Sequence, residues 1–98
     1  MAGRVEGKIA LITGAAQGLG EAIARMLVRE GARVVLTDLN EAKVKAVAAS
    51  LGADKAVAFA QDVTDEAGWI ATIDKAADAF GGIDILVNNA GISGGTTV

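Results

Sequence analysis

Short apolar runs alternate with longer amphipathic segments along almost the whole chain of 98 residues. The apolar runs lie at residues 9–12, 33–38, 55–61 and 83–88. Apolar side chains recur at helical spacing in residues 19–30, 41–51 and 65–80. A short continuous apolar run that stops at a turn is typical of a buried strand, and the longer period is typical of a helix. The pattern therefore predicts four strands and three helices in the order βαβαβαβ.

Strands that alternate with helices form a parallel sheet with right-handed crossovers. We expect an α/β fold of the Rossmann type, a doubly wound parallel sheet that is incomplete in this chain. The first two helices should cover one face of the sheet and the third helix the other. The last strand should be an open edge, and an open edge invites association. We therefore expect a homo-oligomer.

The helix ends carry recognisable capping residues. Asn40 and Thr64 stand where N-caps are expected, and glycines follow each helical segment. In the first helix, helical spacing predicts a buried stripe of Ala22, Ile23, Met26 and Leu27. In the third helix, it predicts a buried stripe of Trp69, Ile70, Ile73, Ala77 and Phe80. We interpret Trp69 as a core residue, because it shares the register of its apolar neighbours; a stacking platform is the alternative.

Composition excludes several classes of function. The formal net charge is −3, which disfavours binding to nucleic acid or to an anionic membrane. The chain has no Cys and no His, so disulfides, thiolate metal sites and histidine-based catalysis are absent and no metal site is expected. No apolar stretch is long enough to cross a bilayer, and residues 1–8 do not resemble a signal peptide. We expect a cytoplasmic protein.

The turn after the first strand is rich in glycine. It reads Thr-Gly-Ala-Ala-Gln-Gly-Leu-Gly over residues 13–20 and opens the first helix. A pyrophosphate can sit there on free backbone N–H groups at the positive end of the helix. Gly14 would permit the tight turn, Gly18 the close approach of backbone to phosphate, and Gly20 the close packing of the helix. The position between strand and helix favours a nucleotide site over an ordinary turn.

An acidic residue ends the second strand. Asp38 lies 18 residues after Gly20, where a carboxylate accepts hydrogen bonds from the adenosine ribose and repels the extra phosphate of NADP. The alternative is an aspartate that caps a helix or stabilises a turn. No basic residue lies in the glycine loop or directly after Asp38, and we interpret Arg4 and Arg33 as solvated. The sequence therefore predicts NAD in preference to NADP.

The third strand ends in Asp62-Val63 and the fourth in Asn88-Asn89-Ala90-Gly91. Ligands of open α/β sheets bind outside the carboxyl ends of the strands, so these residues should converge with the glycine loop. Taken together, the motifs at residues 13–20, 62–63 and 84–91 resemble those of the short-chain dehydrogenase/reductase family. Their order and separations also match, and the resemblance covers essentially the whole chain. The glycine spacing resembles the compact, single-domain branch of that family.

The resemblance implies a set of cofactor contacts. The pyrophosphate and the adjoining ribose would contact Gly14, Gln17, Gly18 and Leu19. The adenosine ribose and the adenine would contact Asp38 and Leu39. The adenine ring would contact Asp62, through its side chain, and Val63, through its backbone. The second ribose region would contact Asn89, Ala90 and Gly91, whereas Asn88 is expected to brace the sheet.

The family resemblance also implies a Tyr-x-x-x-Lys pair, and this chain contains no Tyr. We therefore expect residues 1–98 to be the NAD-binding portion of a single-domain dehydrogenase, with no catalytic residue and no activity alone. The intact protein would transfer a hydride between NAD(H) and a small alcohol or ketone. The alternatives are a nucleotide-binding fragment or engineered half-domain without catalysis, and a methyltransferase-like domain, against which the glycine spacing and the Asn-Asn-Ala-Gly motif argue.

Overall fold

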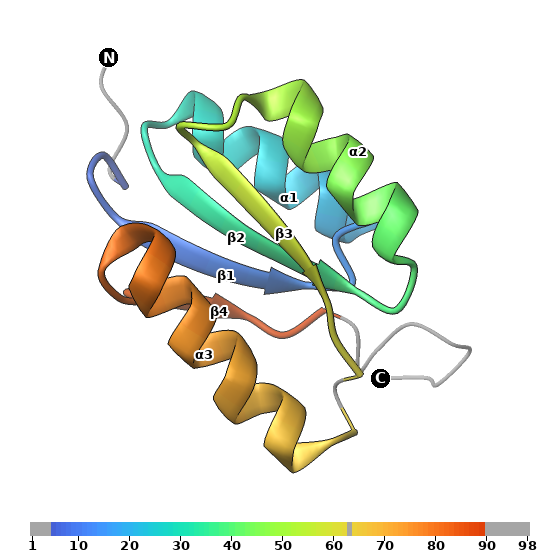
Figure 1. The fold of residues 1–98 in the computed structure, drawn as a ribbon. Helices are drawn as coiled ribbons and strands as arrows, with labels where there is room; N and C mark the ends of the chain where they lie inside the picture. The colour runs from blue at the N-terminus through green and yellow to red at the C-terminus, as the bar shows by residue number, and fades with distance from the viewer. Residues whose placement is uncertain (1–4, 63, 90–98) are drawn as a thin grey trace.

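The computed structural model describes residues 5–62 and 64–89. Strands and helices alternate in the predicted order (Figure 1). The elements are β1 (Ile9–Thr13), α1 (Gly18–Arg29), β2 (Arg33–Asp38), α2 (Glu41–Leu51), β3 (Ala56–Ala60), α3 (Glu66–Phe80) and β4 (Ile85–Val87). β4 is shorter than the predicted strand at residues 83–88.

All strand pairs are parallel, and the strand order is β3-β2-β1-β4. Leu11 of β1 pairs with Val35 of β2 on one side and with Leu86 of β4 on the other. The chain thus moves outward from β1 through β2 to β3 and then returns to the opposite side of β1. The turn after β1 lies at the point where this order reverses, which is the usual position of a ligand in a doubly wound sheet.

The helices lie on the two faces as predicted. α1 and α2 cover one face and α3 lies on the other (Figure 1). Alternate strand residues supply the core of each face, because successive side chains of a strand point to opposite sides. The α1–α2 side holds the larger buried cluster, which includes Ala10, Ile12, Val34, Leu36, Ala24, Leu27, Val44 and Val47. The fully buried apolar residues on the α3 side are Leu11, Val35 and Ala76.

The buried stripe of α1 differs from the predicted one. Gly20, Ala24 and Leu27 are buried, whereas Ala22 and Met26 are exposed. Ile23 is partly buried against the core, as expected. The small residues Gly20 and Ala24 bring the helix close to its neighbours, so burial here follows small size more than hydropathy.

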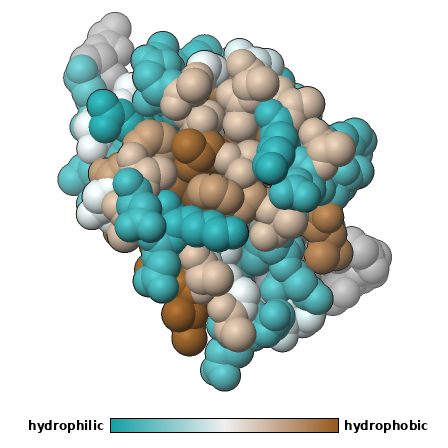
Figure 2. Space-filling model, viewed as in Figure 1, coloured by the Kyte–Doolittle hydropathy of each residue, from teal (hydrophilic) through white to brown (hydrophobic). Residues whose placement is uncertain are grey.

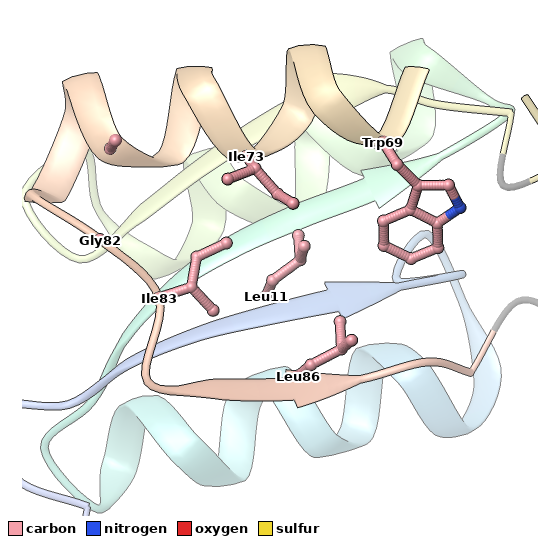
Figure 3. A pocket seen from close by; sticks show the side chains of 7 residues that line it. Leu11, Trp69, Ile73, Gly82, Ile83 and Leu86 are labelled. Carbon is pink, nitrogen blue, oxygen red and sulfur yellow. The ribbon is translucent and has the colours of Figure 1, made fainter. Parts of the chain in front are cut away.

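The buried stripe predicted for α3 is confirmed only in part. Thr72 and Ala76 are its buried residues, and Trp69 and Phe80 pack partly buried against the sheet. The predicted residues Ile70, Ile73 and Ala77 are exposed, with 62% of Ile70 accessible. Ile73 and Ala77 lie on the side of α3 that faces the sheet, but they line an open groove with Leu11 and are therefore exposed (Figure 3). Helical spacing thus predicts the sheet-facing side of α3 but not how completely that side is covered.

The N-cap of α3 is Asp65, one residue after the predicted Thr64. The Asp65 side chain accepts a hydrogen bond from the backbone N–H of Ala67. Thr64 instead donates its hydroxyl to Asp62. The prediction for α2 is confirmed, because Asn40 Oδ1 accepts from the backbone N–H of Lys43 at 3.1 Å.

One prediction concerns the core. Leu36 is fully buried and Leu39, three residues later, is 75% exposed. Leu36→Ala removes buried methyl groups and leaves a cavity, so it should lower the free energy of unfolding by about 2–5 kcal/mol. Leu39→Ala is the matched control and should change it by less than about 0.5 kcal/mol. Urea unfolding followed by circular dichroism measures both, and equal effects would contradict the core assignment.

Candidate functional site

The glycine loop between β1 and α1 is fixed against the end of β2. The backbone N–H of Ala15 donates to the Thr37 carbonyl at 3.0 Å. The next N–H, that of Ala16, donates to Asp38 Oδ2 at 3.1 Å. Ala15 and Ala16, both residues of the loop, are buried. Two elements that lie more than twenty positions apart in the sequence thus form one rigid corner at the carboxyl ends of adjacent strands.

Asp38 is the central polar group of this corner. Its Oδ1 atom accepts a hydrogen bond from the backbone N–H of Asn40 at 2.9 Å, while Oδ2 accepts from Ala16. Asp38 therefore stabilises the turn, which was the alternative role considered for it. An ionised carboxylate has about four acceptor positions, so two remain for a ligand. Asp38 is half-buried and open to one side.

The start of α1 lacks a side-chain cap. Its N-cap residue, Gln17, has extended backbone, and its side chain accepts no hydrogen bond from the first turn. The Gln17 side chain instead points to α2, where its Oε1 atom accepts from Lys43 Nζ at 2.5 Å. The first N–H groups of a helix have no partner within the helix and form its positive end. This end of α1 is thus available to an anion.

The space above the loop is open. Gly14 and Gly18 both have positive φ, of 62° and 63°, which favours glycine. A Cβ atom on Gly18 would meet no other atom within 4 Å. The following residue, Leu19, is 61% exposed. The loop is therefore a cradle whose shape suits a phosphate group approached by backbone.

Gly20 has a different role from Gly18. A Cβ atom there would lie 2.2 Å from the Gly14 carbonyl oxygen and 2.8 Å from Asn89 Nδ2. Asn89 Nδ2 itself donates to the Gly14 carbonyl at 3.2 Å. The expected close packing at Gly20 is confirmed, but against the loop and the end of β4 rather than against the body of a strand.

The end of β4 joins the same corner. Asn88 Oδ1 accepts from the Thr13 hydroxyl at 3.1 Å, which ties β4 to β1 as expected for a bracing residue. Asn89 is brought to the glycine loop by its bond to Gly14. Ala90 and Gly91, predicted as site residues, lie outside the described residues.

The end of β3 stands slightly apart. Asp62 is exposed, and its Oδ1 atom accepts from the Thr64 hydroxyl at 2.6 Å and from the Thr64 backbone N–H at 2.9 Å. These two hydrogen bonds, the hydroxyl first, hold the pKa of Asp62 below its ordinary value. Asp62 makes no hydrogen bond to the glycine loop. Val63, also a predicted site residue, lies outside the described part of the chain.

Two polar residues near the site were missed by the sequence analysis. Lys43 contacts the glycine loop through Gln17, although the sequence analysis considered only Arg4 and Arg33. Gln61 is 95% buried, at 5% accessibility, and both polar atoms of its amide lack a hydrogen-bond partner. Its backbone N–H donates to the Asp38 carbonyl at 3.0 Å. The position of Lys43 in the first turn after Asn40 follows from the sequence, but its contact with Gln17 does not.

The structure gives no sign of a metal site or a membrane segment in residues 5–62 and 64–89. No three acidic, His or Cys side chains gather there in a way that would hold a metal ion. None of the helices described is both long enough and apolar enough to span a membrane.

A family model described as short chain dehydrogenase matches residues 8–98, almost the whole chain. The chain belongs to the short-chain dehydrogenase family. The glycine loop, Asp38 and the Asn88–Asn89 pair identified from the sequence all fall within the matched region. The Rossmann-type fold and the family expected from the sequence are thus confirmed.

Named relatives are similar over nearly the whole chain. A 3-alpha-(or 20-beta)-hydroxysteroid dehydrogenase of Mycobacterium tuberculosis is 51% identical, with 94% of this chain and 35% of the relative covered. A D-threitol dehydrogenase of Mycolicibacterium smegmatis is 49% identical, with 92% of this chain and 35% of the relative covered. The chain thus spans about a third of the length of these relatives.

A solved structure gives the same fold. A 3-ketoacyl-(acyl-carrier-protein) reductase from Brucella melitensis complexed with NADH superposes with a TM-score of 0.81 at 44% identity. The alignment covers 84% of this chain and 34% of that reductase. The four-stranded sheet of this short-chain dehydrogenase chain is therefore shared by a full-length dinucleotide enzyme.

An apolar groove lies elsewhere, between α3 and β4 (Figure 3). Its volume is about 270 Å³, and its lining is Leu11, Trp69, Ile73, Ala77, Gly82, Ile83 and Leu86. Figure 2 shows further apolar surface on the same side of the molecule, where α3 leaves part of the sheet bare. Ligand sites usually combine apolar walls with a few convergent polar groups. Among the described residues that line this groove, Trp69 is the one whose side chain carries a polar atom, so the polar corner at the glycine loop is the better candidate site.

Two helical glycines offer a test of the corner. Gly20→Ala places a methyl group 2.2 Å from the Gly14 carbonyl oxygen and should lower the free energy of unfolding by about 3 kcal/mol. Gly68→Ala is the control, since its nearest contact is an ordinary 3.5 Å, and it should stabilise α3 by about 0.5–1 kcal/mol. Thermal unfolding of both variants measures the difference. Similar melting temperatures would show that α1 does not approach the loop as described.

Proposed function

We propose that this chain forms the dinucleotide-binding part of an NAD-dependent oxidoreductase that acts on an alcohol or ketone. The observation that carries the proposal is the hydrogen bond from Ala16 N–H to Asp38 Oδ2. That bond holds an acidic side chain beside a glycine cradle, at the point where the strand order reverses. A dinucleotide carries both a pyrophosphate, which suits the glycine cradle, and a ribose diol, which suits the neighbouring carboxylate.

The pyrophosphate would bind at the start of α1. Gly14, Gln17, Gly18 and Leu19 would line it. The open space above Gly18 admits the phosphate oxygens, and the free N–H groups of the first turn donate to them. Because Gln17 is held by Lys43, its side chain does not occupy the helix end. The geometry of the loop therefore fits the anionic part of the cofactor.

The adenosine half would lie against the end of β2. Asp38 has acceptor capacity left after its two backbone contacts, and the ribose 2′- and 3′-hydroxyls would fill it. Leu39 is 75% exposed and would lie flat against the adenine. A carboxylate at this position repels a 2′-phosphate, which supports NAD as the preferred cofactor.

The family resemblance implies the remaining contacts, and we propose them on that basis. Asp62, kept ionised by Thr64, would accept from the adenine amino group. Asn89 would meet the second ribose region, although its Nδ2 atom already donates to Gly14. Val63, Ala90 and Gly91 would complete the adenine and ribose contacts.

The reaction proposed for the whole protein is alcohol–ketone interconversion. The nicotinamide supplies the hydride chemistry when it is bound: the alcohol carbon gives up a hydride, and the hydroxyl gives up a proton. The contribution of this chain is to bind and orient the cofactor. The relatives are named as hydroxysteroid and D-threitol dehydrogenases, which supports this reaction class.

A second function, nucleotide binding without catalysis, is favoured by one observation. The 98 residues contain no Tyr, His or Cys, so these common catalytic proton carriers and nucleophiles are missing from the sequence. The cofactor site proposed above is the same under both readings. They differ in the whole protein, where only an oxidoreductase reduces its bound dinucleotide when an alcohol is added, as absorbance would show; residues 1–98 alone are expected to be inactive under both.

The cofactor proposal is tested by calorimetric titration of the full chain with NADH and with NADPH. We expect NADH to bind more tightly. Asp38→Asn should weaken NADH binding about tenfold, because charge-assisted hydrogen bonds to the ribose become neutral ones. Asp54→Asn, which changes an exposed acid at the opposite end of β3, is the matched control and should have no effect.

Two results would contradict the proposal. One is an absence of binding to either cofactor by a chain that circular dichroism shows to be folded. The other is equal weakening by Asp38→Asn and by Asp54→Asn, since that would place the ribose away from Asp38.

A further inference from the structure

The ammonium group of Lys43 connects α2 to the glycine loop. Lys43 Nζ donates to Gln17 Oε1 at 2.5 Å, and both side chains are exposed. Lys43 belongs to the first turn of α2, where its backbone N–H is held by Asn40 Oδ1. Asn40 in turn donates its own N–H to Asp38. The Lys43 side chain therefore starts beside Asp38 and ends at the rim of the phosphate cradle.

The neighbouring charges are already paired. Glu41 of the same turn lies 3.1 Å from Lys45, and Glu21 of α1 lies 2.8 Å from Arg25. Among the described residues, Lys43 has no carboxylate within ion-pair distance. Of the two basic residues interpreted above as solvated, Arg33 lies over the Phe80 ring at 5.7 Å and Arg4 lies outside the described residues. Lys43 is therefore the cation available at the adenosine end of the site.

We propose that Lys43 is a specificity-determining residue that reads the 2′ position of the adenosine ribose. Its ammonium group attracts a 2′-phosphate and so offsets part of the repulsion from Asp38. This inference rests on the proposed function, because it assumes that adenosine binds between Asp38 and Gln17. The ammonium has three N–H donors and Gln17 uses one, so two can reach a phosphate oxygen.

The consequence is a site with two opposing determinants. Asp38 accepts from free ribose hydroxyls and favours the unphosphorylated cofactor. Lys43 favours the phosphorylated one, so the preference for NAD is smaller than Asp38 alone would give. An exposed cation acts through a field that salt screens within about 8–10 Å at ordinary ionic strength. The tolerance of a 2′-phosphate should therefore fall as salt is added.

The test uses adenosine 5′-monophosphate and adenosine 2′,5′-bisphosphate, which differ by the 2′-phosphate alone. Both are titrated calorimetrically into the full chain and into the variants Lys43→Gln and Lys45→Gln. Lys45 is the matched control, since it lies on the same helix, is exposed and is paired with Glu41. Lys43→Arg is added to retain the charge.

We expect Lys43→Gln to weaken bisphosphate binding about tenfold, the size of effect that one charge-assisted contact gives. Monophosphate binding should weaken much less, through the loss of the contact that holds Gln17. Lys43→Arg should retain bisphosphate binding, and Lys45→Gln should change neither affinity. As the salt concentration rises, the affinity of the original chain for the bisphosphate should approach that of Lys43→Gln.

Other outcomes overturn the inference. If Lys43→Gln weakens both nucleotides equally, or neither, Lys43 does not read the 2′ position. If the original chain binds the monophosphate and Lys43→Gln changes nothing, this inference fails while the proposed function stands. If the original chain binds neither nucleotide, the proposed function fails first and this inference fails with it.

Discussion

The hydrogen bond from the Ala16 backbone to the Asp38 carboxylate is the contact on which the rest of the site depends. It joins the turn after β1 to the end of β2, and the parallel pairing of Thr13 with Thr37 brings these two points together. Asp38 also fixes Asn40, which caps α2 and so positions Lys43. One carboxylate thereby sets the shape of the glycine loop, the start of α2 and the charge at the adenosine end of the site.

The two faces of the sheet are packed differently, and this difference makes the corner possible. The α1–α2 face is packed with small aliphatic residues, so α1 can approach until Gly20 touches the glycine loop. The α3 face is more open and leaves an apolar groove beside β4. Firm packing under the loop lets a cluster of backbone N–H groups hold its geometry without the ligand. Such preorganisation reduces the ordering cost of binding.

Most of the fold and much of the site could be predicted, because they depend on local patterns. Apolar runs and capping residues gave the seven elements, and Asp38, Gly18 and Asn88 lie where their motifs indicated. The exposure of Ile73 could not be predicted, since helical spacing shows that it faces the sheet but not that the groove there stays open. Lys43 was missed because its contact with Gln17 crosses between two helices. The unpartnered amide of Gln61 is likewise a property of packing, which no local pattern shows.

The central claim is that a dinucleotide spans the corner between α1 and Asp38. The most direct measurement is a crystal structure of the full chain soaked with NADH. The account predicts pyrophosphate oxygens about 3 Å from the first N–H groups of α1, with ribose hydroxyls at the same distance from Asp38. It also predicts that the bond between Ala16 and Asp38 is retained. A dinucleotide bound in the groove between α3 and β4, with Asp38 free of ligand, would contradict the account.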